Sequence, residues 1–220
     1  MRSLDTQHVQ RIKYAIFLIA LIPFGRLLYG VFVDPELLGA NPAETITRST
    51  GDWTLRFLLI TLAVTPLRRM LDWNWLIKLR RMLGLFAYFY VLLHLSSYVA
   101  FDHVFDVGEI LRDIVKRPFI TVGMTAFLLL TPLALTSTNA MVRRLGGKRW
   151  QALHRLIYII APLGVLHFWW MVKRDIREPL LYAVILAVLL GYRLFHARRN
   201  RPIAARIKSD LRPSSAGPKA

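Results

Sequence analysis

The sequence predicts an all-α membrane protein, a six-transmembrane-helix bundle with both termini in the cytoplasm. The chain has 220 residues, of which 55% are hydrophobic, and most of these residues are gathered in six long apolar blocks. Each block has about the 20 residues with which an α-helix crosses a bilayer. The blocks are continuous and do not alternate with polar residues, which excludes the pattern of a membrane β-barrel.

The blocks begin and end at residues that suit helix ends. The first, at about residues 14–33, contains Pro23 and Arg26 and lacks a small-residue cleavage site, so we expect a retained helix and not a signal peptide. The fourth follows Pro118, and proline is favoured in the first turn of a helix. The spans predicted after the first lie at about residues 53–67, 82–101, 119–140, 150–172 and 179–196.

These spans form one membrane domain, residues 1–198, followed by a tail at residues 199–220. The tail is basic at first and then rich in Pro, Ser and Ala. Such a composition cannot bury enough apolar surface to fold, so we expect a disordered cytoplasmic tail.

The charge balance is strongly basic, with 30 Lys and Arg against 13 Asp and Glu, a net charge of +17. A nucleic-acid-binding protein would place this charge on a soluble face. Here the basic residues lie between the apolar blocks, so we expect a lipid bilayer and no nucleic acid as partner.

The distribution of charge predicts the orientation. Basic residues are concentrated at 68–81, 143–149 and 193–208, whereas acidic residues are concentrated at 34–52 and 102–113. Because basic loops stay on the cytoplasmic side, both termini are expected there.

The chain contains no cysteine, which excludes covalent haem attachment through CxxCH and cysteine-ligated iron–sulfur clusters. Three histidines lie inside apolar segments: His94, His154 and His167. At about 1.5 Å of rise per residue, His94 and His167 lie at similar depth in the outer half of the membrane. We predict that these two are the axial ligands of an outer haem b, because buried imidazole is the usual ligand of such iron.

His154 is expected near the cytoplasmic edge, where it would ligate or adjoin an inner haem. It shares a predicted helix with His167, but 13 residues turn the side chain by about 140°, so Pro162 would have to kink that helix for both to face one way. No histidine of the third span matches its depth. Each intramembrane histidine has an alternative role in hydrogen bonding a neighbouring helix. His103 is expected to be a solvated loop residue.

Arg26 is costly inside an apolar span. It either snorkels to the outer surface or neutralises a haem propionate or an anionic partner.

Several motifs resemble the MsrQ (YedZ) family of haem-binding membrane subunits of protein-methionine-sulfoxide reductases. The resemblance covers about residues 10–198, and the motifs are TPL at 65–67, RRMLGL at 80–85, LHLSSY at 93–98, RPF at 117–119, LTSTNAM at 135–141, GKRWQALH at 147–154 and HFWW at 167–170. The chain is more distantly similar to the ferric-reductase-like transmembrane domain. Proteins with that domain use two histidines on the third helix, where this chain has one, and it also lacks their nicotinamide- and flavin-binding domain.

The resemblance implies a role in electron transfer. MsrQ-type proteins take electrons from the quinone pool and pass them through haem b to MsrP, a periplasmic molybdopterin enzyme that reduces methionine sulfoxide in oxidised proteins. The resemblance also implies FMN, for which the sequence shows no recognisable site. His94, His154 and His167 match the family's haem-associated histidines, which leaves one or two haems.

Two alternative functions remain at this point: a ferric or quinone reductase without a dedicated partner, and a small transporter that uses its intramembrane histidines. A transporter would be expected to show acidic residues within the spans or repeat symmetry, and neither is visible. The segment from Asp102 to Arg117 is the first candidate for docking the partner.

Overall fold

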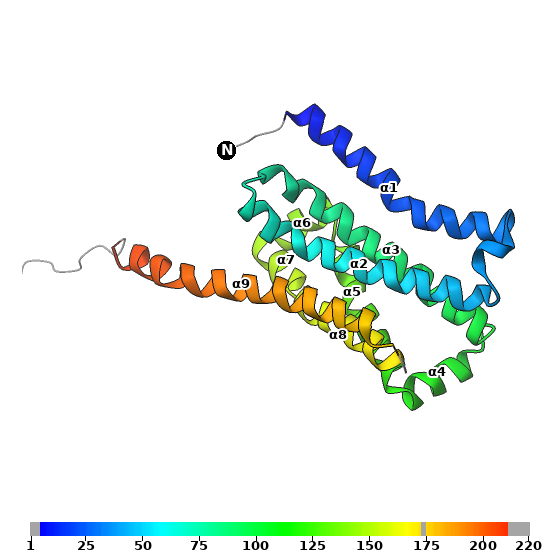
Figure 1. Ribbon diagram of the computed structural model, residues 1–220. Coiled ribbons are helices and arrows are strands. Elements are labelled where there is room, and N and C mark those ends of the chain that lie inside the picture. The colour runs from blue at the N-terminus through cyan, green and yellow to red at the C-terminus, as the bar shows by residue number, and fades with distance from the viewer. Residues whose placement is uncertain (1–4, 173–174, 211–220) are drawn as a thin grey trace, which may run out of the picture.

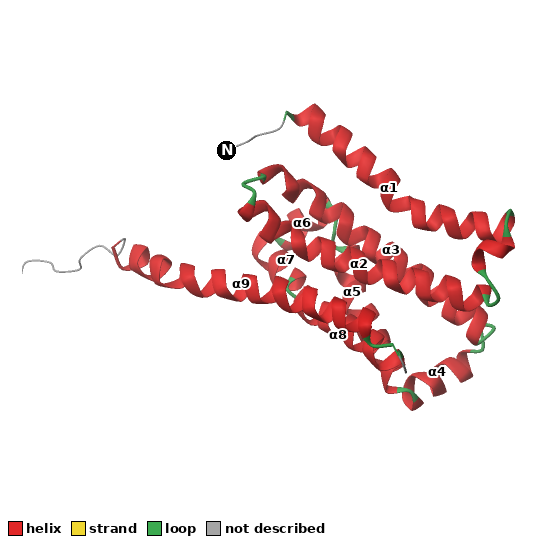
Figure 2. Cartoon of the chain, viewed as in Figure 1, coloured by secondary structure: helices red, strands yellow, loops and turns green. Residues whose placement is uncertain are grey.

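The computed structural model describes the backbone at residues 5–172 and 175–210, with side chains described up to residue 199. Within these ranges the chain forms helices joined by short loops, and no strand is present (Figure 2). The all-α prediction is therefore confirmed. In chain order the helices are α1 (Thr6–Phe32), η1 (Pro35–Leu38), α2 (Pro42–Met70), η2 (Asn74–Leu79), α3 (Arg80–Ser97), η3 (Tyr98–Asp102), α4 (Val107–Lys116), α5 (Pro118–Leu135), α6 (Asn139–Leu145), α7 (Gly147–His154), α8 (Ile157–Met171) and α9 (Arg177–Asp210).

Five segments of the described chain are long and apolar enough to cross a membrane: Thr6–Phe32, Asn74–Asp102, Pro118–Leu135, Gly147–Met171 and Arg177–Arg199. They coincide with five of the six predicted spans. The remaining predicted span lies in α2, which has 29 residues and is therefore about 43 Å long. Its composition sets it apart, because charged residues occupy its first half and its last turn: Glu44, Arg48, Asp52, Arg56, Arg68 and Arg69.

The polarity of α2 agrees with its place in the bundle. It packs along α3 and also contacts α8 and α9 (Figure 1), so less of its surface needs to be apolar. The aromatic rings of Phe57 on α2 and Tyr90 on α3 stack with centroids 5.4 Å apart. The Tyr90 hydroxyl then donates to the Ala20 carbonyl of α1 at 2.7 Å. This buried contact ties the first helix to the central pair.

The predicted helix at 150–172 is broken into α7 and α8. The break is not at Pro162 but at Arg155 and Leu156, nearly two turns earlier. There the Tyr158 N–H donates to the Arg155 carbonyl at 3.0 Å, and such i→i+3 bonds tighten the chain in the manner of a 3₁₀ turn. The donor that Pro162 lacks would have bonded the Tyr158 carbonyl inside α8, so the proline does not account for this break.

The connection between α3 and α5 is also more ordered than the sequence suggests. The chain leaves η3, a π-helical turn, through Val104 and Phe105, whose φ angles of 44° and 63° are rare for such side chains. It then forms α4. His103, expected to be solvated, is instead mostly buried, with Nε2 3.2 Å from the Asp113 carboxylate.

At the other end of the chain, α9 extends through residue 210, so residues 199–210 are helical where the sequence predicts disorder. Ala204 and Ala205 favour a helix and continue the one that precedes them. Residues 211–220 of the predicted tail lie outside the described residues.

Candidate functional site

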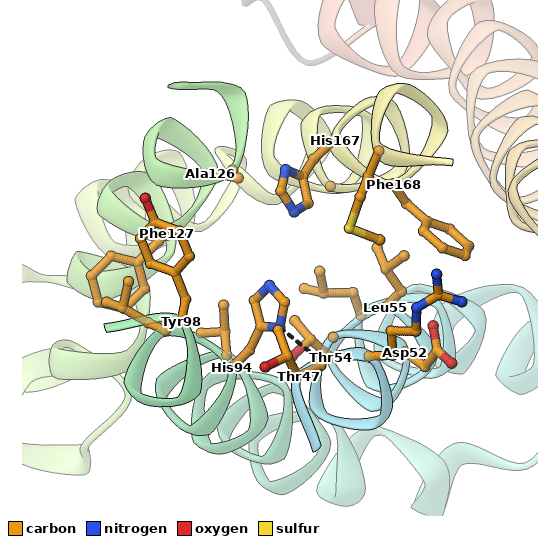
Figure 3. A pocket seen from close by; sticks show the side chains of 18 of the residues that line it. Thr47, Asp52, Thr54, Leu55, His94, Tyr98, Ala126, Phe127, His167 and Phe168 are labelled. Atoms are coloured by element: carbon orange, nitrogen blue, oxygen red, sulfur yellow. Dashed lines mark hydrogen bonds between the residues drawn. The ribbon is translucent and has the colours of Figure 1, made fainter. Parts of the chain in front are cut away.

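His94 on α3 and His167 on α8 face each other inside the bundle (Figure 3). Their ring centroids are 6.1 Å apart and their planes cross at 80°. The matched depth that the sequence predicts for these two residues is therefore confirmed. Their role as metal ligands stays a prediction.

Each ring is held by a backbone carbonyl of a different neighbouring helix. His94 Nδ1 lies 2.9 Å from the Thr47 carbonyl of α2, and His167 Nδ1 lies 2.7 Å from the Phe119 carbonyl of α5. A carbonyl oxygen can only accept, so both Nδ1 atoms must carry the proton. The Nε2 atoms are then unprotonated and available as metal ligands.

A glycine makes each of these approaches possible. Gly51 follows Thr47 by four residues, and Gly123 follows Phe119 by four residues. In a helix the residue at i+4 lies directly above the carbonyl of residue i. A Cβ on Gly51 would lie 3.1 Å from the His94 ring, and a Cβ on Gly123 would lie 2.7 Å from His167 Nδ1.

The two imidazoles border a cavity of about 710 Å³, within the range of cofactor sites. Its walls come from one face each of α2, α3, α5 and α8, and they are largely apolar (Figure 3). Charged residues line another part of it: Arg48, Asp52, Asp175 and Glu178. The site is thus a hydrophobic chamber with a charged margin.

This donor set fits a haem iron. The ring centroids are 6.1 Å apart, a spacing that would admit one metal ion bound by both imidazoles at a nitrogen–metal distance of about 2 Å. Within the described residues no cluster of three or more His, Asp or Glu could enclose a bare ion. A group that brings its own in-plane ligands, such as a porphyrin, suits two imidazoles.

His154 stands apart from this cavity, at the end of α7. Its ring stacks on Trp150 with centroids 3.8 Å apart, and its Nδ1 lies 3.0 Å from the Trp150 carbonyl. Its Nε2 lies 3.4 Å from the Ser137 hydroxyl, and the backbone of Leu133 on α5 is also within reach of the ring. The structure therefore does not bring His154 together with the other two histidines, and it gives His154 partners from its own helix and from the loop after α5.

Arg26 is exposed on α1 and does not line the cavity.

Comparisons with known proteins give a consistent result. The family described as "Ferric reductase like transmembrane component" matches residues 50–165. Three proteins named "Protein-methionine-sulfoxide reductase heme-binding subunit MsrQ" are similar over most of their length. The protein of Herminiimonas arsenicoxydans is 62% identical over 192 residues, covering 86% of this chain and 87% of its own.

The two other relatives are nearly as similar. The protein of Polaromonas naphthalenivorans is 58% identical over 186 residues, 84% of either chain. That of Azospira oryzae is 53% identical over 198 residues, 89% of this chain and 84% of its own. The chain belongs to the MsrQ family. No solved structure gives a significant match to this MsrQ-family chain.

Sequence reasoning found the histidines of this MsrQ-family site but missed the residues that hold them. Gly51 and Gly123 lie inside helices at the depth of His94 and His167. A glycine at the depth of each histidine was the available signal that a ring approaches a neighbouring backbone there. The carbonyls of Thr47 and Phe119 cannot be identified from the sequence, because every residue has the same backbone carbonyl acceptor, whatever its side chain.

Proposed function

We propose that this chain is a haem b electron-transfer subunit of the bacterial inner membrane. It would take electrons from the respiratory quinone pool and deliver them to a periplasmic MsrP-like molybdopterin enzyme, which repairs oxidised periplasmic proteins by reducing methionine sulfoxide. The relatives are named as haem-binding subunits of a protein-methionine-sulfoxide reductase, which supports the haem. The quinone and the MsrP-like partner rest on the family resemblance.

The observation that supports the proposal best is the facing pair His94 and His167 in an apolar chamber. Haem iron held between two histidines exchanges one electron between its ferric and ferrous states. The protein's part is to present both Nε2 atoms unprotonated and to hold the rings through the carbonyls of Thr47 and Phe119. The apolar walls keep water from the metal, which favours electron transfer over ligand exchange.

The proposed direction of electron flow depends on orientation. We propose six spans, with α2 as the sixth, and both termini in the cytoplasm. The His94–His167 pair then lies toward the periplasmic side, where the acidic segments 34–52 and 102–113 are. An outer haem at this depth is well placed to reduce a periplasmic partner.

His154 enters the proposal as the ligand or neighbour of an inner haem, closer to the cytoplasm. Its Nε2 contact with the Ser137 hydroxyl is long, at 3.4 Å, so binding of a metal there would cost little in that hydrogen bond. FMN enters the proposal through the family resemblance alone.

A second candidate function is a ferric or quinone reductase without a dedicated partner. The match of residues 50–165 to a ferric-reductase-like component favours it. Both candidates require haem, and they differ in whether reduced haem passes electrons to a periplasmic protein or to a small acceptor.

The deciding experiment is a dithionite-reduced minus oxidised absorption spectrum of the purified protein, with haem quantified per chain. We expect a b-type spectrum that is lost in large part in His94→Ala and in His167→Ala. Exposed His8 supplies the matched control His8→Ala, which should keep the wild-type haem content. A well-folded wild-type protein without haem would overturn the proposal and return these residues to helix packing or transport.

The partner is tested separately. Wild-type protein in membrane discs with a quinol should reduce an added MsrP-like enzyme in the presence of methionine sulfoxide. Reduction of ferric chelates at the same rate, with no turnover of the enzyme, would favour the second candidate.

A further inference from the structure

The short helix α4 (Val107–Lys116) has two sharply different faces. Its apolar residues recur at the i, i+3, i+4, i+7, i+8 spacing of one helix face: Val107, Ile110, Leu111, Ile114 and Val115. The outermost of these are strongly exposed, with 66% of Val107, 59% of Leu111 and 83% of Val115 accessible. The apolar face of this helix therefore points away from the protein.

One residue of the polar face, Asp113, anchors α4 to the bundle, whereas Glu109, Arg112 and Lys116 are exposed. Asp113 is buried and receives three contacts: from the Tyr98 hydroxyl at 2.9 Å, from His103 Nε2 at 3.2 Å and from Arg117 Nε at 2.8 Å. The Thr121 hydroxyl also donates to the Ile114 carbonyl. These bonds fix the rotation of α4 about its axis, so the exposure of its apolar face is set by buried polar contacts.

The connections of α4 determine its position relative to the ends of the neighbouring spans. It follows a candidate span that ends at Asp102 and precedes one that begins at Pro118, at one end of the bundle and oblique to the long helices (Figure 1). Four connecting residues, 103–106, reach at most about 14 Å. The helix is thus held close to the membrane surface on the side where those spans end.

We propose that α4 is an interfacial helix whose apolar face is immersed in the phospholipids of the outer leaflet. The exposed side chains of Phe101 and Phe105 on either side of the turn continue this face toward the lipid-facing surface of the spans. Exposed Arg112 and Lys116 lie on the opposite side, at the height of headgroup phosphates. This is the pattern of helices that lie in the membrane interface.

The size of the apolar face argues against a protein as its occupant. Ten residues make a helix about 15 Å long, and one face of it is about 10 Å wide. That gives roughly 150 Å², far less than the roughly 800 Å² per partner that a stable protein interface buries. Lipid needs no such minimum.

Immersion of α4 would also bear on the cavity. Tyr98 lines the cavity, and its hydroxyl is bonded to Asp113 of α4. A helix held in the leaflet would therefore fix one wall of the chamber that contains His94 and His167. The sequence suggests the segment from Asp102 to Arg117 for docking a partner. The present proposal places lipid, and not a protein, on the apolar face of that segment.

The absence of cysteine from the chain allows a clean test. Single cysteines are introduced in the full-length protein as Leu111→Cys, Val115→Cys and, as the matched control on the polar face, Arg112→Cys. Each carries a nitroxide spin label, and the protein is placed in nanodiscs of phosphatidylethanolamine and phosphatidylglycerol. Collision rates with oxygen, which concentrates in lipid, and with a nickel chelate, which stays in water, are then measured.

The expected result is an oxygen-to-nickel accessibility ratio several-fold higher at residues 111 and 115 than at residue 112. Nickel accessibility at residues 111 and 115 equal to that at residue 112 would overturn the proposal in favour of a solvated helix. Protection of residues 111 and 115 from both reagents would also overturn it, and would indicate a second copy or another protein on this face. Two exposed positions are labelled independently, so failure of one variant to fold leaves the test intact. Haem content does not enter the readout.

Discussion

The histidines at the two ends of the bundle are held by different kinds of contact. At the end that holds the cavity, His94 and His167 are fixed by carbonyls of other helices, across contacts 47 and 48 residues apart in sequence. At the other end, His154 is fixed by Trp150, one turn before it in its own helix. The first arrangement is specified by tertiary packing and exposes Nε2 to a chamber. The second would persist in an isolated helix, so it is weaker evidence for a ligand-binding role.

The most direct test of this difference between the two ends is a substitution at Gly123. In Gly123→Ala the new methyl would lie 2.7 Å from His167 Nδ1, a separation that forces the imidazole away from the Phe119 carbonyl. We expect loss of most of the outer haem, measured as reduced-minus-oxidised absorbance per chain.

Two other glycines supply an intermediate case and a control for this experiment. Gly51→Ala places its methyl at 3.1 Å from the His94 ring, so we expect haem to be retained with a shifted spectrum. Gly191→Ala meets no atom within 4 Å and should behave as wild type. Equal haem contents in Gly123→Ala and Gly191→Ala would show that the carbonyl contact does not position the ligand.

A smaller effect is expected at Asp113, whose three contacts hold the cavity end together. Asp113→Ala leaves the Tyr98 hydroxyl and the His103 ring without this partner, which costs about 2 kcal/mol and should lower the midpoint of thermal unfolding in detergent. Glu109→Gln on the same helix removes only an exposed pair with Arg112 and should leave that midpoint unchanged. Matching midpoints for the two variants would mean that α4 is not held by Asp113.

The smallest effect is expected at the opposite end. Trp150→Phe keeps an aromatic ring against His154 but removes the indole N–H bond to the Thr136 carbonyl, 2.9 Å long. Loss of one such bond costs about 1 kcal/mol, measured as the same thermal midpoint. The outer haem spectrum should not change, and a change would show that the two ends are coupled.

The sequence was sufficient for the features that depend on local pattern. Apolar blocks located the long helices, and counting residues along two of them placed His94 and His167 at one depth. Pro162 was the expected site of a kink, but the break between α7 and α8 lies nearly two turns earlier, at Arg155 and Leu156, where no proline or glycine marks it in the sequence. The burial of His103 was missed because its partner, Asp113, is brought to it only by the fold of η3 and α4.

Helix α4 shows a different limit. Its five apolar positions could be read as one face, but their direction depends on Asp113, a charged residue that the fold turns inward. An amphipathic pattern alone would have pointed the apolar side toward the bundle. The orientation expected from the loop charges stays a prediction.

The carbonyl contacts of His94 and His167 have a consequence for genetics. Replacing Thr47 or Phe119 by alanine leaves the acceptor in place and removes only side-chain contacts, that of Thr47 Oγ1 with Ser97 and that of the Phe119 ring with His167. An alanine scan that omits glycine would therefore leave both carbonyl contacts intact. A mutational map built on side-chain removal would report the two histidines and their side-chain neighbours, but not the backbone acceptors that hold the rings.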